Sequence, residues 1–449
     1  MLSGAPSFLP APGAGLARLL VGCATHAGRT GMASLALVLV ACGSDTPGTP
    51  GEREVTARDS AGVTIVENRA PELSGSDAWR LSEQPTLQIG SLDDPDEIFA
   101  RVTAARTLSD GRIATLDTRA HQVKVFGPHG ALLTTFGREG EGPREFNFSW
   151  GADFDVLRGD TLLVFDGGLR RISLFESGGS FITVIRPQPP EPSGGFSYFA
   201  RFDNGSYMTR GGTNPMYLGE GDGLIRGAGW ISRLGPDGES MGNILEYRTG
   251  ETVVAGGGRA SIGTRLGRRH IAVPGREGPV VGFADGFHFE MYDWEGRLLR
   301  IVRRVWDPIA VADAEVDSFM VTVDRTVDRM RQMGADVTMR KIDFPEVHSA
   351  FDEAMVDPAG NVWIRTFRPR TSLSRGDEEG RSQEGEEGQQ EEGEVPRRWS
   401  VFDPEGRWTT DVLVPADLQI MEIGEAHVLA VWADELGVQY LRRYELIRG

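Results

Sequence analysis

Three aspartates that each follow an apolar run are the first candidates for chemistry in this sequence. Asp117, Asp166 and Asp285 stand where a carboxylate could bind a cation or act as a base. Asp117 and Asp166 occur in similar surroundings 49 residues apart, whereas an active site needs one set of groups and not a copy in each repeat. We therefore favour a structural role, in which each carboxylate accepts hydrogen bonds from its own turn.

Arginines follow the first two aspartates closely in the sequence. Their guanidinium groups could form a cationic rim that recognises a carboxylate or a sugar acid. They could equally pair with the aspartates at the surface, where an ion pair contributes little to stability. The candidate rim of a central channel comprises Asp117, Arg119, Asp166, Arg170, Arg171 and Asp285.

Residues that commonly hold metals form no recognisable motif. The seven histidines include neither an HxH nor an HExxH pattern, and the two cysteines, Cys23 and Cys42, lie near the N-terminus. The sequence therefore predicts no thiolate metal site, no disulfide in the body of the chain and no cysteine nucleophile. It also has no nucleophile elbow, P-loop or dinucleotide-binding glycine motif in a fitting context. We predict no cofactor and no metal.

The N-terminal residues 1–41 have the features of an export signal. An apolar run, MASLALVLVA at 32–41, is too short to span a bilayer, which needs about 20 residues, and has the length of a signal-peptide core. The sequence LVACGS around Cys42 resembles the lipobox of bacterial lipoproteins. That resemblance implies cleavage before Cys42, lipid on its sulfur, and, from Gly43, delivery to the outer membrane. Residues 42–59 would then be a flexible tether.

The body of the chain repeats a pattern of short strands and turns. Residues 111–137, GRIATLDTRAHQVKVFGPHGALLTTFG, show apolar alternation broken by a Pro-His-Gly turn, and the next stretch repeats the pattern 49 residues later. The turn glycine recurs at Gly130, Gly179, Gly238, Gly296 and Gly406. Such repeats predict small sheets that must pack on one another to bury their faces.

The two ends of the repeat array complement each other. Residues 85–90 resemble an outer strand with no inner strands before them, and the C-terminal residues 420–447 form inner strands with no outer strand after them. We therefore predict an all-β, six-bladed β-propeller over residues 60–449, whose N-terminal strand closes the last blade. The expected blades are 100–138, 150–186, 198–247, 265–305, 351–415, and 420–447 with 85–90.

Two segments interrupt the repeats. Residues 311–334 carry an apolar stripe at helical spacing, which predicts one inserted amphipathic helix, either capping a face of the ring or packed on its outside. Residues 377–394, DEEGRSQEGEEGQQEEGE, are too acidic and too poor in apolar residues to fold alone. We expect this acidic segment to be a disordered loop within the fifth blade.

Residues 110–146, DGRIATLDTRAHQVKVFGPHGALLTTFGREGEGPREF, are similar to an NHL repeat. Residues 60–449 as a whole resemble bacterial six-bladed β-propeller lipoproteins with such repeats. The resemblance implies a fold and a location in the cell envelope. It implies no particular reaction, because function resides in sites and not in folds.

The formal net charge of −18 argues against nucleic acid as a partner, and the lipid anchor is the only membrane attachment that we expect. The leading hypothesis is a lipid-anchored outer-membrane protein that serves as a binding or scaffold propeller and faces the periplasm or the exterior. Its partner would be an envelope protein, a peptide or a glycan. The alternative is a metal-assisted hydrolase or lyase that acts at the mouth of the channel, with ligands converging from several blades.

Overall fold

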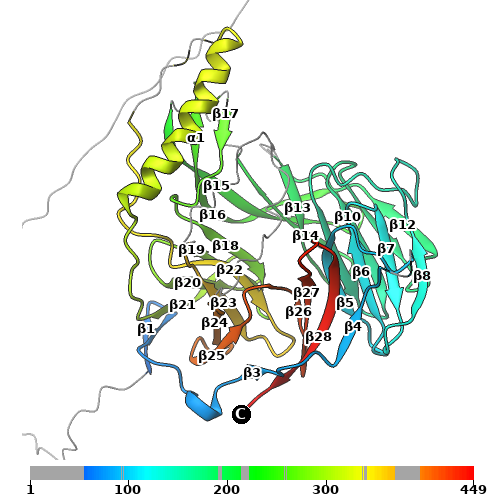
Figure 1. Ribbon diagram of the computed structural model, residues 1–449. Helices are drawn as coiled ribbons and strands as arrows, with labels where there is room; N and C mark the ends of the chain where they lie inside the picture. Colours follow the sequence, from blue (N-terminus) through cyan, green and yellow to red (C-terminus); the bar gives the residue numbers. More distant parts are fainter. Residues whose placement is uncertain are drawn as a thin grey trace, which may run out of the picture. The chain divides into compact units, whose positions relative to one another are not determined.

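The computed structural model describes residues 55–449 except 93, 95, 191–194, 214–221, 257, 259, 336, 338–340 and 370–394. These described residues are mostly β-structure, arranged in small and largely antiparallel sheets with one α-helix (Figure 1). The leader 1–41, Cys42 and the acidic segment 377–394 lie outside the described residues.

Three sheets form the first half of the described chain, and consecutive strands pair in antiparallel fashion within each. Sheet one contains β5 (Val102–Thr107), β6 (Ile113–Asp117), β7 (Gln122–Phe126) and β8 (Leu132–Phe136). Sheet two contains β9 (Ala152–Leu157), β10 (Thr161–Asp166), β11 (Arg171–Phe175) and β12 (Phe181–Ile185). Sheet three contains β13 (Gly195–Arg201), β14 (Tyr207–Gly212), β15 (Gly223–Leu234), β16 (Ser240–Ala255) and β17 (Ala260–Ile262).

Three further sheets form the second half, and two of them recruit strands from the N-terminal end. Sheet four contains β18 (His270–Pro274), β19 (Pro279–Phe283), β20 (His288–Tyr292) and β21 (Leu298–Arg304), extended by β2 (Val63–Asn68) and β1 (Val55–Ser60). Sheet five contains β22 (Phe351–Val356), β23 (Val362–Thr366), β24 (Arg397–Phe402) and β25 (Trp408–Val414). Sheet six contains β26 (Leu418–Ile423), β27 (His427–Ala433) and β28 (Gln439–Ile447), with β4 (Leu87–Ile89) and β3 (Arg80–Leu81).

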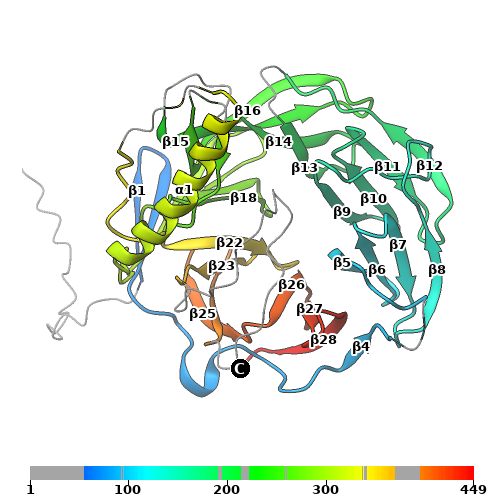
Figure 2. The same cartoon turned by 45° about the horizontal axis from the view of Figure 1, so that its top comes forward.

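The first strands of the sheets lie around a common centre, as Figure 2 shows. Strand β5 contacts both β26 and β9, β13 contacts β9 and β18, and β18 contacts β22. Each first strand runs away from the connection that precedes it, and the second strand runs back. The turn between second and third strands therefore lies at the same end as the connection between sheets. We call this end of the sheets the loop end, and the opposite one, with the turns between first and second strands, the far end.

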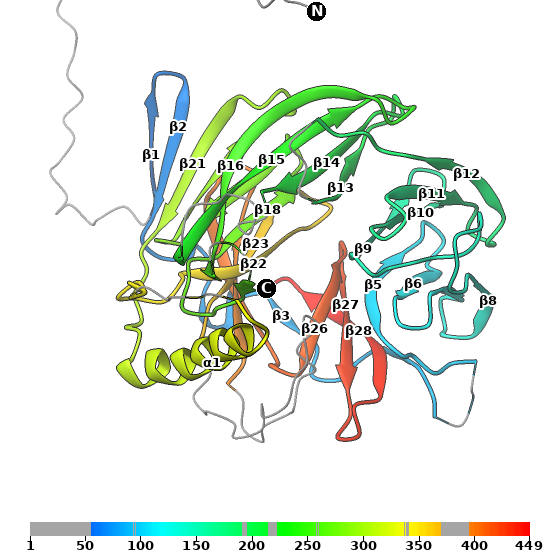
Figure 3. The ribbon, with the colours of Figure 1, turned by 90° about the horizontal axis from the view of Figure 1, so that it is seen from above.

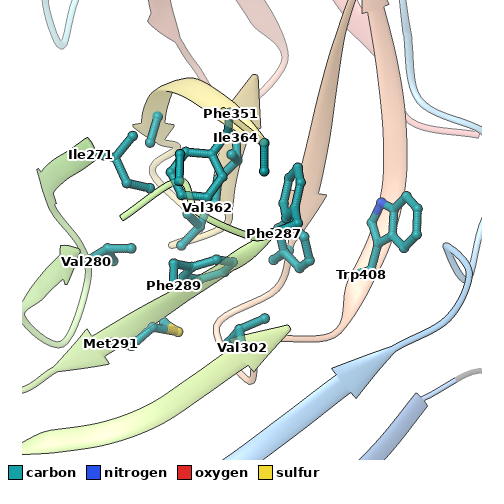
Figure 4. Close-up of a cluster of buried hydrophobic side chains, with 14 residues drawn as sticks. Ile271, Val280, Phe287, Phe289, Met291, Val302, Phe351, Val362, Ile364 and Trp408 are labelled. Carbon is teal, nitrogen blue, oxygen red and sulfur yellow. The ribbon is translucent and has the colours of Figure 1, made fainter. Parts of the chain in front are cut away.

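Apolar clusters fill the space between neighbouring sheets. Sheets four and five share one that includes Phe289, Phe351 and Trp408 (Figure 4). Other clusters join sheets one and two, two and three, three and four, and five and six. A further cluster, with Ile89 and Phe126, joins sheet six to sheet one. Each sheet thus covers both of its faces with its neighbours.

The repeated turn glycines expected from the sequence all adopt left-handed backbone angles, with φ between 82° and 93°. Each lies between the third and fourth strands of its sheet. A Cβ on Gly179 would lie 2.6 Å from Phe136, and one on Gly406 would lie 2.5 Å from Val302, each on the last strand of the preceding sheet. Both the backbone angle and the close contact therefore require glycine.

Strands from both ends of the described chain meet in sheet six. Residues Leu87–Ile89 of β4 pair with Arg443–Leu441 of β28, and β3 pairs with the end of the same strand. The turn at Gly130 packs on Ile89, as the turn at Gly179 packs on the outer strand of sheet one. Strand β4 thus takes the place of an outer strand, as the sequence of residues 85–90 predicted.

The tether predicted over residues 42–59 is too long at its C-terminal end. Strand β1 starts at Val55 and forms an antiparallel hairpin with β2, which pairs in parallel with β21 (Figure 3). The side chains of β1 are almost all exposed, so its residues lack the apolar face that would have marked a strand in the sequence.

Sheet three is longer than the expected blade 198–247, because β15 and β16 continue past it at the loop end and add β17. Helix α1 (Asp313–Gln332) lies within the segment 311–334 and packs on this extension (Figure 1). Val323, Val327 and Met330 of the helix share a cluster with Val253 and Ala255 of β16. No described helix is both long and apolar enough to cross a membrane.

Candidate functional site

The carboxylates of Asp117 and Asp166 are fully buried and bind backbone amides. Asp117 accepts hydrogen bonds from the amides of Ala100, Arg101 and Ala120, at 2.7 to 3.0 Å. Asp166 accepts hydrogen bonds from the amides of Asn147 and Leu169, at 2.7 and 2.9 Å. Each aspartate ties the end of a second strand to the connection that enters its sheet, so these contacts fit the structural role favoured from sequence.

The two turns are copies in backbone geometry as well. His121 and Arg170 each stand four residues after the aspartate and adopt left-handed φ angles of 56° and 49°. Burial raises the pKa of Asp166, and the amides of Asn147 and Leu169 oppose that rise. A carboxylate with its oxygens committed to amides has little capacity left for a ligand.

The arginines assigned to the rim divide into two kinds. Arg119 and Arg170 are exposed at the loop end, and the Arg170 guanidinium lies 4.9 Å from the ring centre of Phe196. Arg171 is buried instead, and its Nη2 donates to the carbonyl of Gly142 at 2.6 Å. The rim assignment is therefore wrong for Arg171, which holds the connection between sheets one and two.

A buried lysine has the same role one sheet earlier. Lys124 Nζ donates to the carbonyls of Asp96 and Ile98, in the connection that leads into sheet one. Burial lowers the pKa of both Lys124 and Arg171. Each cation is thus part of the framework that fixes a connection between sheets.

Asp285 is not a third copy of the buried aspartates. It follows β19 in an exposed turn, and its Oδ1 lies 3.6 Å from Nε2 of His288. Both side chains are about two-fifths exposed, so this contact contributes little to stability.

A polar cluster that the sequence did not reveal lies where the first strands of sheets two, three and four adjoin. Its members, which we call the Arg210 cluster, are Asp153 of β9, Ser197 of β13, Arg210 of β14, Tyr247 of β16 and His270 of β18. The Arg210 side chain joins two of the sheets. Its Nε donates to Ser197 Oγ at 3.0 Å, and its Nη1 donates to the carbonyl of Ala272 at 2.8 Å.

Backbone contacts fix the other members of the Arg210 cluster. The amide of Tyr198 donates to Asp153 Oδ2 at 3.0 Å. The amide of Gly250 donates to Nδ1 of His270 at 2.8 Å, and the His270 ring lies 5.9 Å from that of Tyr247. Because Nδ1 accepts this bond, a neutral His270 carries its proton on Nε2.

Burial is the main electrostatic influence on the Arg210 cluster. It raises the pKa of Asp153 and of Tyr247, and the charge of Arg210 opposes both shifts. Burial and the charge of Arg210 together lower the pKa of His270 to about 4. At neutral pH the cluster therefore presents one fixed cation, one carboxyl group and two uncharged donors.

A second polar cluster joins sheets six and one at the far end. The amide and hydroxyl of Thr107 both donate to Glu422 Oε2, at 2.9 and 2.7 Å. Nε2 of His427 lies 3.0 Å from the same hydroxyl, which is then its acceptor. Although burial opposes it, the neighbouring His427 ring, 3.6 Å away, and the hydrogen bond from the Thr107 hydroxyl hold the pKa of Glu422 below its ordinary value. With its donors and acceptors paired, this cluster fastens the two sheets together.

Exposed large apolar side chains are distributed unevenly over the described residues. None lies in a turn between first and second strands or between third and fourth strands. Five lie on outer strands: Leu133, Phe181, Ile182, Met241 and Leu413. The others lie in second-to-third-strand turns or in connections between sheets: Leu92, Ile98, Trp150, Val305, Ile309, Val321, Met333, Val395 and Leu436. The loop end is thus the apolar one.

Two surface hollows lie away from the Arg210 cluster. One, of about 480 Å³, follows the outer side of α1 near Val321 and Arg325, and the other, of about 450 Å³, lies at 137–145. Among the described residues, no group of three or more histidine, cysteine, aspartate or glutamate side chains could hold a metal ion.

Comparisons with known proteins find similarity in structure only. No protein-family model matches the chain, and no curated protein matches it. A member of the DUF4221 family from Bacteroides vulgatus aligns with 84% of this chain and 100% of its own, at 10% identity and a TM-score of 0.47. A protein described as exported, from Bacteroides fragilis, aligns with 85% and 99%, at 9% identity and a TM-score of 0.46.

Virginiamycin B lyase from Staphylococcus aureus aligns with 82% of this chain and 97% of its own, at 10% identity and a TM-score of 0.33. At these scores and identities, the likenesses carry no conclusion about the activity of this chain.

Proposed function

We propose that this chain is a lipid-anchored protein of the cell envelope, a closed six-bladed β-propeller that binds a partner protein at its loop end. The observation that carries the binding role is that all exposed large apolar side chains outside the outer strands lie in the turns and connections of that end. Trp150 is 82% exposed, Leu436 83% and Met333 74%. Exposed apolar groups collected on one side of a soluble domain are typical of interaction sites.

The closed ring is supported by packing between all neighbouring sheets. An apolar cluster fills each of the six boundaries, including that between sheets six and one. In sheet six, β4 from one end of the described chain pairs with β28 from the other. A ring joined in this way leaves no long open edge between its first and last blades.

The anchor is supported by the lipobox-like residues at Cys42 and by the short distance from there to the first strand. β1 starts at Val55, and a chain of this length spans at most about 45 Å when fully extended. Lipid on Cys42 would therefore hold the propeller close to the membrane, where an outer-membrane partner is within reach.

A protein is the partner that the exposed groups favour. Aliphatic side chains such as Leu436, Leu92 and Met333 outnumber the single exposed tryptophan at the loop end. Glycan sites depend on aromatic platforms, whereas the centres of protein interfaces bury aliphatic and aromatic groups together. Peptides and glycans are the competing outcomes of the test.

Site-specific photo-crosslinking in intact cell envelopes tests the partner. A photoreactive residue replaces Trp150 or Leu436 at the loop end, and Asp203 or Glu405, both exposed turn residues at the far end, as matched controls. We expect one adduct of defined protein mass from the loop-end positions and none from the controls. Equal labelling at all four positions, no adduct at any, or an adduct of glycan contradicts the proposal.

Cell fractionation and mass spectrometry of the mature N-terminus test the anchor separately. Wild-type protein should carry acyl chains on Cys42 and sediment with outer membranes, and Cys42→Ser should release it to the soluble fraction. An unmodified Met1 in the mature protein would refute the anchor while leaving the binding surface unaffected.

A further inference from the structure

We propose that the Arg210 cluster is a binding site for a small zwitterion, with Arg210 taking the carboxylate and Asp153 the ammonium group of an α-amino acid. The inference does not depend on a partner at the loop end. It rests on two opposite charges that are fixed near each other without pairing, and on the uncharged donors around them.

Arg210 and Asp153 are close neighbours through the backbone of β13. Arg210 binds the side chain of Ser197, and Asp153 binds the amide of the next residue, Tyr198. Nevertheless, among the described residues no nitrogen of Arg210 lies within 4.0 Å of an oxygen of Asp153. Each side chain is held by its own contacts, and the two charges do not form an ion pair.

Four polar atoms of the Arg210 cluster have unused hydrogen-bonding capacity. Within the part of the chain that the structure describes, Oδ1 of Asp153, Nη2 of Arg210, Oη of Tyr247 and Nε2 of His270 make no hydrogen bond. None of these four unpaired atoms is fully buried, so solvent reaches each of them. Polar groups that are ordered, unpaired and accessible are available to a ligand.

The charges of the cluster select the ligand. A simple anion would satisfy Arg210 but would lie against the Asp153 carboxylate, and a simple amine would meet the reverse conflict. A zwitterion offers a complementary charge to each of the two groups. The guanidinium edge matches a carboxylate, and the Tyr247 hydroxyl and His270 Nε2–H can donate to the same oxygens.

The adjacent supports of Arg210 and Asp153 on β13 favour a small ligand whose two charges lie close together. In an α-amino acid one carbon separates the ammonium group from the carboxylate, which suits neighbouring residues of β13 as supports.

Ligand-observed NMR on the full-length protein tests the proposal with three probes: L-alanine, acetate and methylammonium. We expect saturable binding of L-alanine and at least about tenfold weaker binding of the other two, a difference of about 1.4 kcal/mol. Equal binding of acetate and L-alanine would make the site an anion site and overturn the proposal. Absence of L-alanine binding to the folded protein would also overturn it.

Variants assign the binding to the cluster. Arg210→Gln and Asp153→Asn should each weaken L-alanine binding at least about tenfold, and Tyr247→Phe, which removes one hydroxyl, should weaken it less. Arg233→Gln is the matched control, because Arg233 lies in the same sheet and contacts Phe202 instead. Circular dichroism and the melting temperature show that each variant is folded. Unchanged binding in Arg210→Gln, or equal loss in Arg233→Gln, contradicts the assignment.

Discussion

Two sets of polar groups differ in how many of their hydrogen-bonding positions are occupied. The turns of Asp117 and Asp166 repeat from sheet one to sheet two, and both oxygens of each carboxylate accept hydrogen bonds from backbone amides. The Arg210 cluster occurs once, draws on three sheets and leaves several polar atoms unpaired. The repeated aspartates thus maintain the fold, whereas the Arg210 cluster keeps hydrogen-bonding capacity.

The sharpest test of that comparison is the loss of a saturated carboxylate. Asp117→Ala leaves the partly buried amides of Ala100, Arg101 and Ala120 without their acceptor, and each hydrogen bond to a charged group contributes about 1.5–3 kcal/mol. We expect urea unfolding to show a loss of about 3–5 kcal/mol. Asp153→Asn, which keeps an oxygen for the Tyr198 amide, should lose less than about 1 kcal/mol. Similar losses in the two variants would remove the distinction.

The pH dependence of stability tests the burial of His270. Its pKa is lowered from 6.5 to about 4 in the folded protein. Between these two pH values the unfolded chain therefore binds a proton on this imidazole, and the folded chain does not. Stability should fall as the pH decreases from about 6.5 to about 4, by at most about 3 kcal/mol, and this contribution should then level off. NMR titration of the imidazole should give a midpoint near 4. His270→Asn should remove this part of the pH dependence; an unchanged profile would contradict the prediction.

The cluster of Thr107, Glu422 and His427 belongs with the saturated groups, although it does not repeat. Thr107→Val removes the hydroxyl that bonds Glu422 and His427, and should cost about 1–2 kcal/mol at pH 7. The pKa of Glu422 is lowered in the folded protein, so its contribution is present above its unfolded pKa and is lost as the pH falls. The difference between wild type and variant should therefore shrink in acid. A constant difference at all pH values would assign the loss to packing alone.

The smallest expected effect separates two adjacent arginines. Arg170 is exposed, and Arg170→Gln should change the free energy of unfolding by less than about 0.5 kcal/mol. Arg171→Gln should cost clearly more, because the buried guanidinium binds carbonyls of the connection between sheets. Chemical unfolding of both variants measures the two losses in free energy of unfolding. A larger loss for Arg170→Gln than for Arg171→Gln would contradict the prediction.

The repeated features of the fold were predictable because each copy in the sequence reinforces the others. Gly130 and Gly179 lie at the same point of the pattern, and the structure gives both the same turn. Asp117 and Asp166 were recognisable as structural for the same reason. Residues 85–90 could be placed because the last sheet lacked an outer strand.

The Arg210 cluster could not be found in this way, because its members are single residues in strands far apart in the chain. The only signal was local: Asp153 and Asp155 alternate with apolar residues in a strand near the centre, where burial of carboxylates is costly. The β1 hairpin and the extension of sheet three were missed because they have no counterpart in the other sheets. Their strands are specified by partners, β21 and α1, that sequence spacing does not reveal.

The pairing of β4 with β28 has a consequence for biogenesis. The two strands are separated by about 350 residues, so a chain emerging N-terminus first exposes the partnerless edge of β4 until β28 has been synthesised. The other sheets can assemble in order, each on the one before, but the final docking step waits for β28. Nascent protein should therefore depend on chaperones late in its maturation, and truncation before β28 should leave an aggregation-prone intermediate.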